Sequence, residues 1–226
     1  MEYSLHPYGH RAWVLKFPSG EFSKTLCLNI LQLSKLFQAQ GNEFWQEIVP
    51  AYDSLLLKTG YGISAQESAV HIEAVMASFT PQDKVTPTTP IDIPVTYGGE
   101  HGPDLDYVAD TCGLTPKEII VRHSERSYLV CMMGFIPGFA FLSETDTALH
   151  IARRTDPRAH VPVGSVGLAG WQTGIYGLES PGGWQIIGRT SSVMFDPKRE
   201  TPYLLSAGDW IRFVPSTVQG LSLIHI

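Results

Sequence analysis

Residues 164–190, GSVGLAGWQTGIYGLESPGGWQIIGRT, decide what kind of fold the second half of this chain can form. They include eight glycines and only two charged residues. Three large aromatic residues lie among the glycines: Trp171, Tyr176 and Trp184. Glycine recurs every third residue from Gly164, as in collagen, but this spacing is lost at Thr173 after three units. A linker would not carry two tryptophans and the apolar run 184–187, which favours burial. The segment therefore predicts tight corners of a β-structure that could frame a cleft.

The sequence on both sides of this segment carries the same signals. Short apolar runs alternate with Gly and Pro turns from residue 128 to residue 214, and the run 128–133 is typical of a strand. Residues 148–154 are expected to form only a brief helix. Many short strands with close turns favour a barrel or sandwich, so we expect a mainly-β domain over residues 95–226.

Two short helices are predicted at the start of this domain. Asp104 is placed to cap a helix that runs through Ala109. The sequence Thr115-Pro-Lys-Glu118 has the form of a capping box with proline at the first helical position, which predicts a second helix.

The first eighty residues alternate between strand-like and helix-like patterns. The expected elements are a strand over 11–17, a helix over 23–40, strands over 44–51 and 54–58, and a helix beginning at the capping box 64–67. This order is part of a ferredoxin-like one, so we expect an α+β domain over residues 1–80. Residues 81–94 are rich in proline and threonine and are interpreted as a linker without regular structure.

Composition excludes several classes of protein. The formal net charge is -6 and the 16 basic residues form no cluster, which disfavours a nucleic-acid partner. No apolar stretch is long enough for a membrane span, and no signal peptide is visible at the start. Three widely spaced cysteines, Cys27, Cys112 and Cys131, favour free thiols in a reducing cytoplasm over a disulfide framework or a zinc site.

Most catalytic signatures are absent as well. The chain has no phosphate-binding loop of the Walker type, no nucleophile elbow around Ser165 and no histidine pair with zinc-site spacing. We expect no metal on this chain. The turn Gly98-Gly99-Glu100 is the best catalytic candidate, because glycine lets backbone amides approach a ligand and Glu100 could orient or deprotonate it. The alternative is that Glu100 only braces a glycine turn.

Further side chains are candidates for binding a substrate, each with a plain structural alternative. Phe135 and Phe139 flank a Pro-Gly turn and could line a pocket or only fill the core. Arg158 could clamp a carboxylate or phosphate, or form a surface salt bridge. In the opening segment, Gln172 and Thr173 could meet a ligand or only hold barrel corners, and the same alternatives apply to Tyr176 and Arg189. Trp184 is expected to fill the barrel.

Three motifs, YGGEHGPDL, GFIPGFAFL and RAHVPVGSVGLAGWQTGIYGLESPGGWQIIGRT, resemble the family of allophanate-hydrolase-subunit-1-like proteins. The resemblance covers nearly the whole chain and is strongest from Val95 to about Pro215. It implies a ferredoxin-like N-terminal domain followed by a cyclophilin-like β-barrel. Carried onto this chain, the family's motif glutamate falls at Glu100, and its phenylalanine turn falls at 135–139. Gly177 and Trp171 depart from the family's usual residues, which puts the substrate in doubt.

The family includes the B subunit of a bacterial ATP-dependent 5-oxoprolinase, which converts 5-oxo-L-proline to L-glutamate. The resemblance therefore implies a C subunit with a related barrel, an A subunit, a small lactam as substrate, and ATP with its Mg²⁺ used by the complex. Phosphorylation of the amide oxygen would turn that oxygen into a leaving group. This chain alone is expected to be inactive. The family also implies two alternatives: an inhibitor of a sensor histidine kinase, or a component of urea or allophanate degradation.

Overall fold

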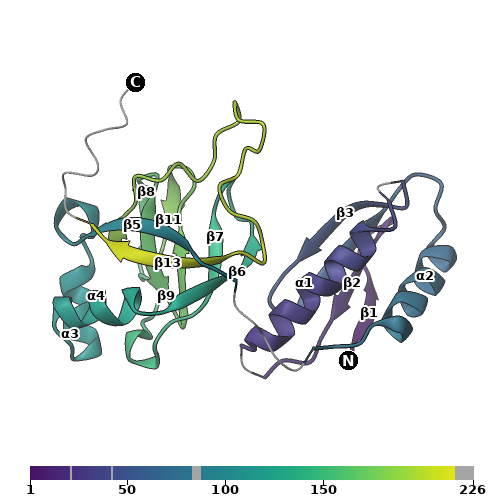
Figure 1. Ribbon diagram of the computed structural model, residues 1–226, viewed down its shortest axis with the longest axis horizontal. Helices are drawn as coiled ribbons and strands as arrows, with labels where there is room; N and C mark the ends of the chain where they lie inside the picture. The colour runs from purple at the N-terminus through teal and green to yellow at the C-terminus, as the bar shows by residue number, and fades with distance from the viewer. Residues whose placement is uncertain (21, 42, 83–87, 217–226) are drawn as a thin grey trace. The chain divides into compact units, whose positions relative to one another are not determined.

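The computed structural model describes residues 1–20, 22–41, 43–82 and 88–216. The chain divides into two compact units, Met1–Thr86 and Pro87–Ile226 (Figure 1). No helix among the described residues is long and apolar enough to cross a membrane.

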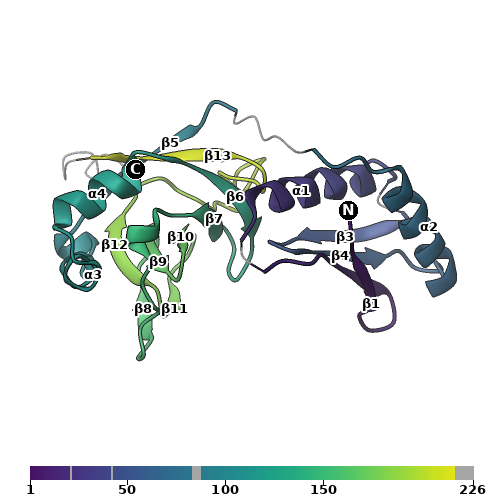
Figure 2. The same ribbon diagram turned by 90° about the horizontal axis from the view of Figure 1, so that it is seen from below.

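The first unit is an antiparallel sheet covered by two helices. The sheet has the strand order β1-β2-β4-β3, formed by β1 (Ser4–Pro7), β2 (Ala12–Lys16), β3 (Trp45–Pro50) and β4 (Ser54–Thr59). Helix α1 (Lys24–Gln38) lies along one face of this sheet (Figure 2), and α2 (Ala65–Ser78) contributes Ile72, Val75 and Met76 to the same core. The sequence predicted every element except β1. That strand pairs with β2 at the edge where a ferredoxin-like fold has a strand following the second helix, so the ferredoxin-like description is met only in part.

Both helices begin where their capping residues indicate. The side chain of Ser23 accepts a hydrogen bond from the backbone N–H of Leu26, and Ser64 accepts one from the N–H of Glu67. These bonds satisfy donors that the first turn of a helix leaves without partners. The apolar face of α1 then buries Ile30, Leu33 and Phe37 against the sheet.

The second unit is a closed seven-stranded barrel with the strand order β10-β7-β6-β13-β5-β12-β9. Its strands are β5 (Ile91–Tyr97), β6 (Ser127–Met133), β7 (Ala140–Glu144), β9 (Ser165–Ala169), β10 (Gln172–Ile175), β12 (Gln185–Arg189) and β13 (Trp210–Pro215). All neighbours pair antiparallel except β13 and β5, which pair in parallel. The expectation of a barrel is therefore confirmed.

Smaller elements surround the barrel. Strands β8 (Arg158–Val161) and β11 (Ser180–Gly182) form a separate two-stranded ribbon that projects from it (Figure 2). Helix α3 (Leu105–Cys112) packs on β12, and α4 (Pro116–Ser124) packs on β13. Both bonds of the predicted capping box at the start of α4 are present.

Two expectations for this unit need correction. Strand β5 begins at Ile91, so residues 91–94 are part of the barrel and not of the linker; residues 83–87 lie outside the described residues. The brief helix expected over 148–154 is only a 3₁₀ turn, Thr147–Leu149. The reason is that Ile151 exchanges backbone hydrogen bonds with Gly170, which satisfies its polar groups by a β-bridge.

Candidate functional site

An aromatic pocket of about 420 Å³ opens beside the barrel. Its lining comes from the phenylalanine turn and β7, from the segment just before β8, from Tyr176, and from residues 180–184, which include β11 and end just before β12. The residues that give it its character are Phe135, Phe139, Phe141, Tyr176, Trp184 and Arg153. Its volume and mainly apolar walls are those of a small-molecule site.

Phe139 is the centre of the aromatic wall and is almost fully buried. Its ring packs edge-to-face on Tyr176 with centroids 4.9 Å apart, and on Trp184 with centroids 5.5 Å apart. Edge-to-face contacts of this kind are favourable and restrict how the rings can turn. One wall of the pocket is therefore preformed.

Phe135 has an unusual backbone and lies at the exposed edge of the pocket. Its φ of 66° makes it the one non-glycine residue with a positive φ among those the structure describes. The N–H of Ile136 donates to the carbonyl of Gly134 at 2.8 Å, which closes a strained γ-turn around Phe135. Its side chain is nevertheless 64% exposed. This strain places a large apolar ring at the opening of the pocket rather than in the core.

Glycine is required at two positions of the wall. A Cβ at Gly182 would lie 2.3 Å from the hydroxyl of Tyr176, and one at Gly177 would lie 2.4 Å from the backbone of Gly138. These glycines allow the ribbon and the phenylalanine turn to pack closely around Tyr176. Burial raises the pKa of the Tyr176 hydroxyl, so this group stays protonated and available as a donor at neutral pH.

Arg153 is the one charged residue in the lining. Its guanidinium carbon lies 5.9 Å from the centroid of the Trp184 ring, a cation–π contact. Among the described residues, no hydrogen bond or ion pair joins it to a carboxylate.

Asp104 lies behind this wall and binds the two arginines that follow Arg153. Its carboxylate is 4% exposed and accepts two hydrogen bonds of 2.7 Å from Arg158. It also accepts from Arg154 at 3.1 Å and from the N–H of Ile186 at 2.6 Å. The hydrogen bonds to Asp104 raise the pKa of Arg158. The cluster joins the start of α3 to β8 and β12.

This cluster corrects two expectations. The side chain of Asp104 forms no capping bond to α3, because its oxygens are taken by the arginines and Ile186. Arg158 does clamp a carboxylate through its planar fork, but that carboxylate is internal. The partner in this salt bridge is therefore buried, whereas the side chain of Arg158 is 25% exposed, and substrate binding by Arg158 stays a prediction.

The glycine turn that carries Glu100 lies outside the lining of the aromatic pocket. Gly98 and Gly99 have φ of 71° and 55°, and the N–H of Gly98 donates to the carbonyl of Ile187 at 3.1 Å. Glu100 is exposed on the 3₁₀ turn Gly99–His101. The structure thus attaches this turn to β12 but does not bring Glu100 together with the aromatic residues.

The remaining predicted residues are dispersed. Thr173 is fully buried in the barrel, where its hydroxyl contacts His123 and donates to the carbonyl of Gly167. Arg189 donates to the carbonyl of Val163 at 2.8 Å. Gln172 begins β10 and pairs with Ala169. Of the predicted binding residues, only Phe135, Phe139 and Tyr176 share the pocket.

Sequence reasoning missed Arg153 and the pocket role of Trp184, whereas Phe141 belongs to the phenylalanine motif 134–142 that the sequence had singled out. The adjacent arginines 153 and 154 could have indicated the site, because each of two neighbouring positive side chains needs a binding partner of its own. No group of three or more His, Cys, Asp or Glu residues that could hold a metal ion lies within residues 1–20, 22–41, 43–82 and 88–216.

The family model described as "Carboxyltransferase domain, subdomain C and D" matches residues 3–205. The chain belongs to this family.

Its relatives confirm the relationship inferred from the three motifs. The Bacillus subtilis (strain 168) protein, named as the B subunit of 5-oxoprolinase, is 35% identical over 226 residues, covering 95% of this chain and 93% of its own length. The protein of that name from Haemophilus influenzae is 41% identical, covering 82% and 85%. The one from Escherichia coli O157:H7 is 54% identical over 125 residues, and the match spans 57% of that relative.

Solved structures agree with this assignment. The crystal structure of TTHA0988 superposes with a TM-score of 0.79 at 35% identity, and the match covers 92% of this chain but 40% of that one. The Kluyveromyces lactis urea amidolyase has a TM-score of 0.79 at 18% identity, which shows a common fold. The match covers 98% of this chain and 15% of the amidolyase chain.

Proposed function

We propose that this chain is the B subunit of an ATP-dependent 5-oxoprolinase that converts 5-oxo-L-proline to L-glutamate. Three relatives are named as B subunits of 5-oxoprolinase, and one of them matches along almost its full length. The observation that carries the proposal is the aromatic pocket, whose size and apolar walls suit a small ring. A lactam ring would lie against Phe139 and Trp184.

The pocket holds and orients the ring but lacks the groups for the whole reaction. Its described lining contains no carboxylate, imidazole or thiol that could act as a general base or nucleophile. We expect the chain to be inactive alone, with A and C subunits supplying the rest of the site. The small share of TTHA0988 and of urea amidolyase that this chain matches supports such a division, because there the same fold is one part of a longer chain.

ATP makes the ring opening possible. An unstrained lactam resists attack by water, because its amide is stabilised by resonance. Transfer of the terminal phosphoryl group to the lactam oxygen releases ADP and makes the ring carbon electrophilic. One water then adds to this carbon, and the C–N bond opens with a proton passing to the nitrogen, which leaves an acyl phosphate. A second water hydrolyses the acyl phosphate to L-glutamate and phosphate. We assign ATP and its Mg²⁺ to the assembled complex and not to a residue of this chain.

Reconstitution tests the proposal. The purified chain is mixed with its cognate A and C subunits, and ADP and L-glutamate are measured with and without 5-oxo-L-proline. We expect lactam-dependent formation of both products only when all three are present. Absence of turnover from the complete mixture would overturn the proposal, and turnover by this chain alone would overturn the division of labour.

Glu100 stays a candidate catalytic residue of the complex. It is exposed on its glycine turn, where a group from another component of the complex can reach it. In the reconstituted complex, Glu100→Gln keeps the shape of the side chain and removes its charge. A fall in kcat of tenfold or more supports a catalytic role, whereas full turnover identifies Glu100 as a brace of the loop.

A second candidate function is inhibition of a sensor histidine kinase, and the exposed ring of Phe135 favours it. A large apolar side chain held outward by a strained turn is suited to docking on a helix of a partner. Co-purification with a kinase and reduced autophosphorylation, both lost in Phe135→Ser, would support this function. Urea amidolyases are more distant relatives, 27% identical over 52% of the chain in Lachancea kluyveri.

A further inference from the structure

Arg153 is the unmatched charge of the aromatic pocket. Three arginines, Arg153, Arg154 and Arg158, lie within six residues, and Asp104 is the one carboxylate among the described residues that pairs with any of them. Arg154 and Arg158 bind it through three hydrogen bonds. Asp104 therefore pairs with Arg154 and Arg158 but not with Arg153. Arg153 is the member of the group that faces the pocket.

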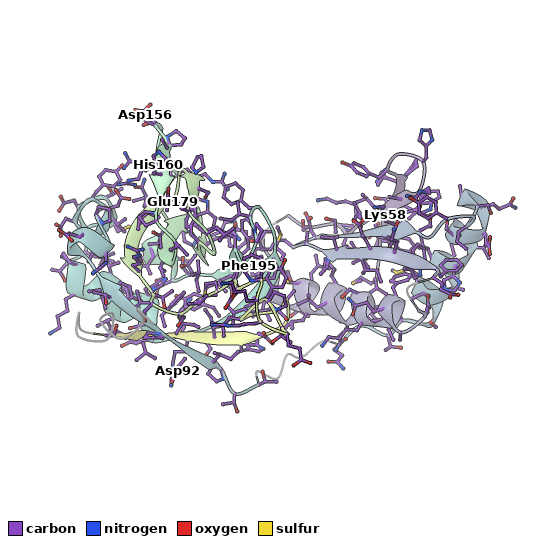
Figure 3. All side chains as sticks on the ribbon, turned by 90° about the horizontal axis from the view of Figure 1, so that it is seen from above. Lys58, Asp92, Asp156, His160, Glu179 and Phe195 are labelled. Atoms are coloured by element: carbon purple, nitrogen blue, oxygen red, sulfur yellow. The ribbon has the colours of Figure 1, made fainter. Side chains whose placement is uncertain are left out.

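No acid among the described residues forms an ion pair with Arg153. Asp156 precedes β8 and lies at the outer tip of this unit in Figure 3, and Glu179, just before β11, has a side chain that is 63% exposed. Glu179 pairs with His160 at 3.2 Å. Neither acid lines the pocket. Arg153 therefore places a positive charge without an ion-pair partner among the described residues at the edge of a mainly apolar cavity.

Trp184 holds the side chain of Arg153 beside the pocket through a cation–π contact. The guanidinium lies over the indole ring, which restricts the side chain without using its N–H donors. A planar guanidinium with free donors can bind a carboxylate through two parallel hydrogen bonds. Next to apolar walls this pair is less screened by water than it would be on an open surface.

We propose that Arg153 binds the carboxylate of a small cyclic acid whose uncharged ring lies against Trp184 and Phe139. The ligand chemistry follows from the pocket: one cation at the edge and aromatic walls beyond it. The inference rests on the proposed function for the choice of 5-oxo-L-proline, whose carboxylate is attached to the lactam ring.

The test is the KM for 5-oxo-L-proline in the reconstituted complex with Arg153→Gln. A hydrogen bond to a charged group contributes about 1.5–3 kcal/mol, so we expect KM to rise about 10- to 150-fold. The kcat changes less than threefold, because Arg153 does not touch the ring carbon that reacts. Arg153→Lys keeps the charge but loses the fork, and its KM should lie between the two. Arg126→Gln, which removes an arginine outside the pocket lining, should leave KM unchanged.

Calorimetry on the full chain alone separates this inference from the proposed function. The probes are 5-oxo-L-proline and its neutral carboxamide, each titrated into the wild type and Arg153→Gln. If the wild type binds the acid more tightly and the variant loses that preference, the inference stands even if the complex shows no turnover. If the complex turns over with an unchanged KM in Arg153→Gln, the inference is wrong and the proposed function is not. Absence of both binding and turnover overturns both.

Discussion

The barrel unit contains two clusters that mix aromatic rings with polar groups, and they are built in opposite ways. In the centre of the barrel, the ring of His123 stacks on Phe213 with centroids 4.4 Å apart. Its two nitrogens bond to Tyr97 at 2.7 Å and to Thr173 at 2.9 Å. In the aromatic pocket, Arg153 lies on a ring but bonds to no described partner.

The two clusters differ in whether their polar groups already have hydrogen-bond partners, and this distinguishes a core from a binding site. A polar group buried among rings is stable only when its hydrogen bonds are made, and His123 meets this condition on both sides. Its burial lowers its pKa to about 3, so it is neutral at physiological pH. Arg153 has no hydrogen-bond partner among the described residues, so its donors are open to the ligand proposed above. Four changes test this comparison.

The largest effect is expected from Asp104→Asn, which removes the negative charge that pairs with Arg154 and Arg158 but not with Arg153. Arg154 and Arg158 would then be left without their carboxylate in a partly buried place. Breaking such a cluster costs about 3–5 kcal/mol in the free energy of unfolding. Urea denaturation followed by circular dichroism measures it. Asp106→Asn, on the exposed face of α3, is the matched control, and an equal loss in both variants would contradict the role of the cluster.

His123→Ala should cost about 3 kcal/mol in the free energy of unfolding at pH 7. It removes a fully buried ring and takes a partner from both Tyr97 and Thr173. Ligand affinity at the pocket, measured by calorimetry, should stay within twofold of the wild type once the variant is folded. A large loss of affinity would mean that the two clusters are coupled.

Gly182→Ala should cost about 1–3 kcal/mol and weaken ligand binding at the same time. The added methyl group would overlap the hydroxyl of Tyr176 and push that ring toward the pocket. Combining it with Tyr176→Phe removes the overlapping atom and should restore part of both quantities. If the double variant is no better than Gly182→Ala, the overlap is not the cause.

Low pH should reduce the contribution of the His123 cluster to the free energy of unfolding, and it should do so over a defined pH range. The pKa of His123 is about 3 in the folded chain and about 6.5 when unfolded, so the unfolded state takes up the proton first. Stability is full above about pH 6.5 and falls as the pH drops toward 3. The gap in unfolding free energy between wild type and His123→Ala should therefore narrow by about 1.4 kcal/mol per pH unit. Leu142→Ala, which truncates a buried side chain of the same core but removes no titratable group, should show no such narrowing.

The elements predicted best from sequence are those fixed by local chemistry. The helix starts at Ser23 and Ser64 and the capping box at Thr115 depend on neighbouring residues only, and all three are observed. Strand β1 was missed because Ser4–Pro7 is short and mostly exposed at a sheet edge, so burial leaves no period-two pattern there.

The site was predicted only in part, because its contacts join distant segments. The glycines and rings of 164–190 correctly indicated close packing, and Tyr176 does meet Phe135 and Phe139. Thr173 points instead to the barrel centre, where His123 comes from 50 residues away. The partner of Arg158 is 54 residues distant, and no local pattern could identify Asp104 as that partner.

The parallel pairing of β5 with β13 also sets the order in which this barrel can form. These strands are the first and last of the barrel, and the ion pair between Asp92 and Arg212 spans 120 residues. During synthesis, the edge of β5 that pairs with β13 therefore stays unpaired until almost the whole unit has left the ribosome. Chains that stop before residue 210 would keep the edges of β5 and β6 open, as templates for association with other chains.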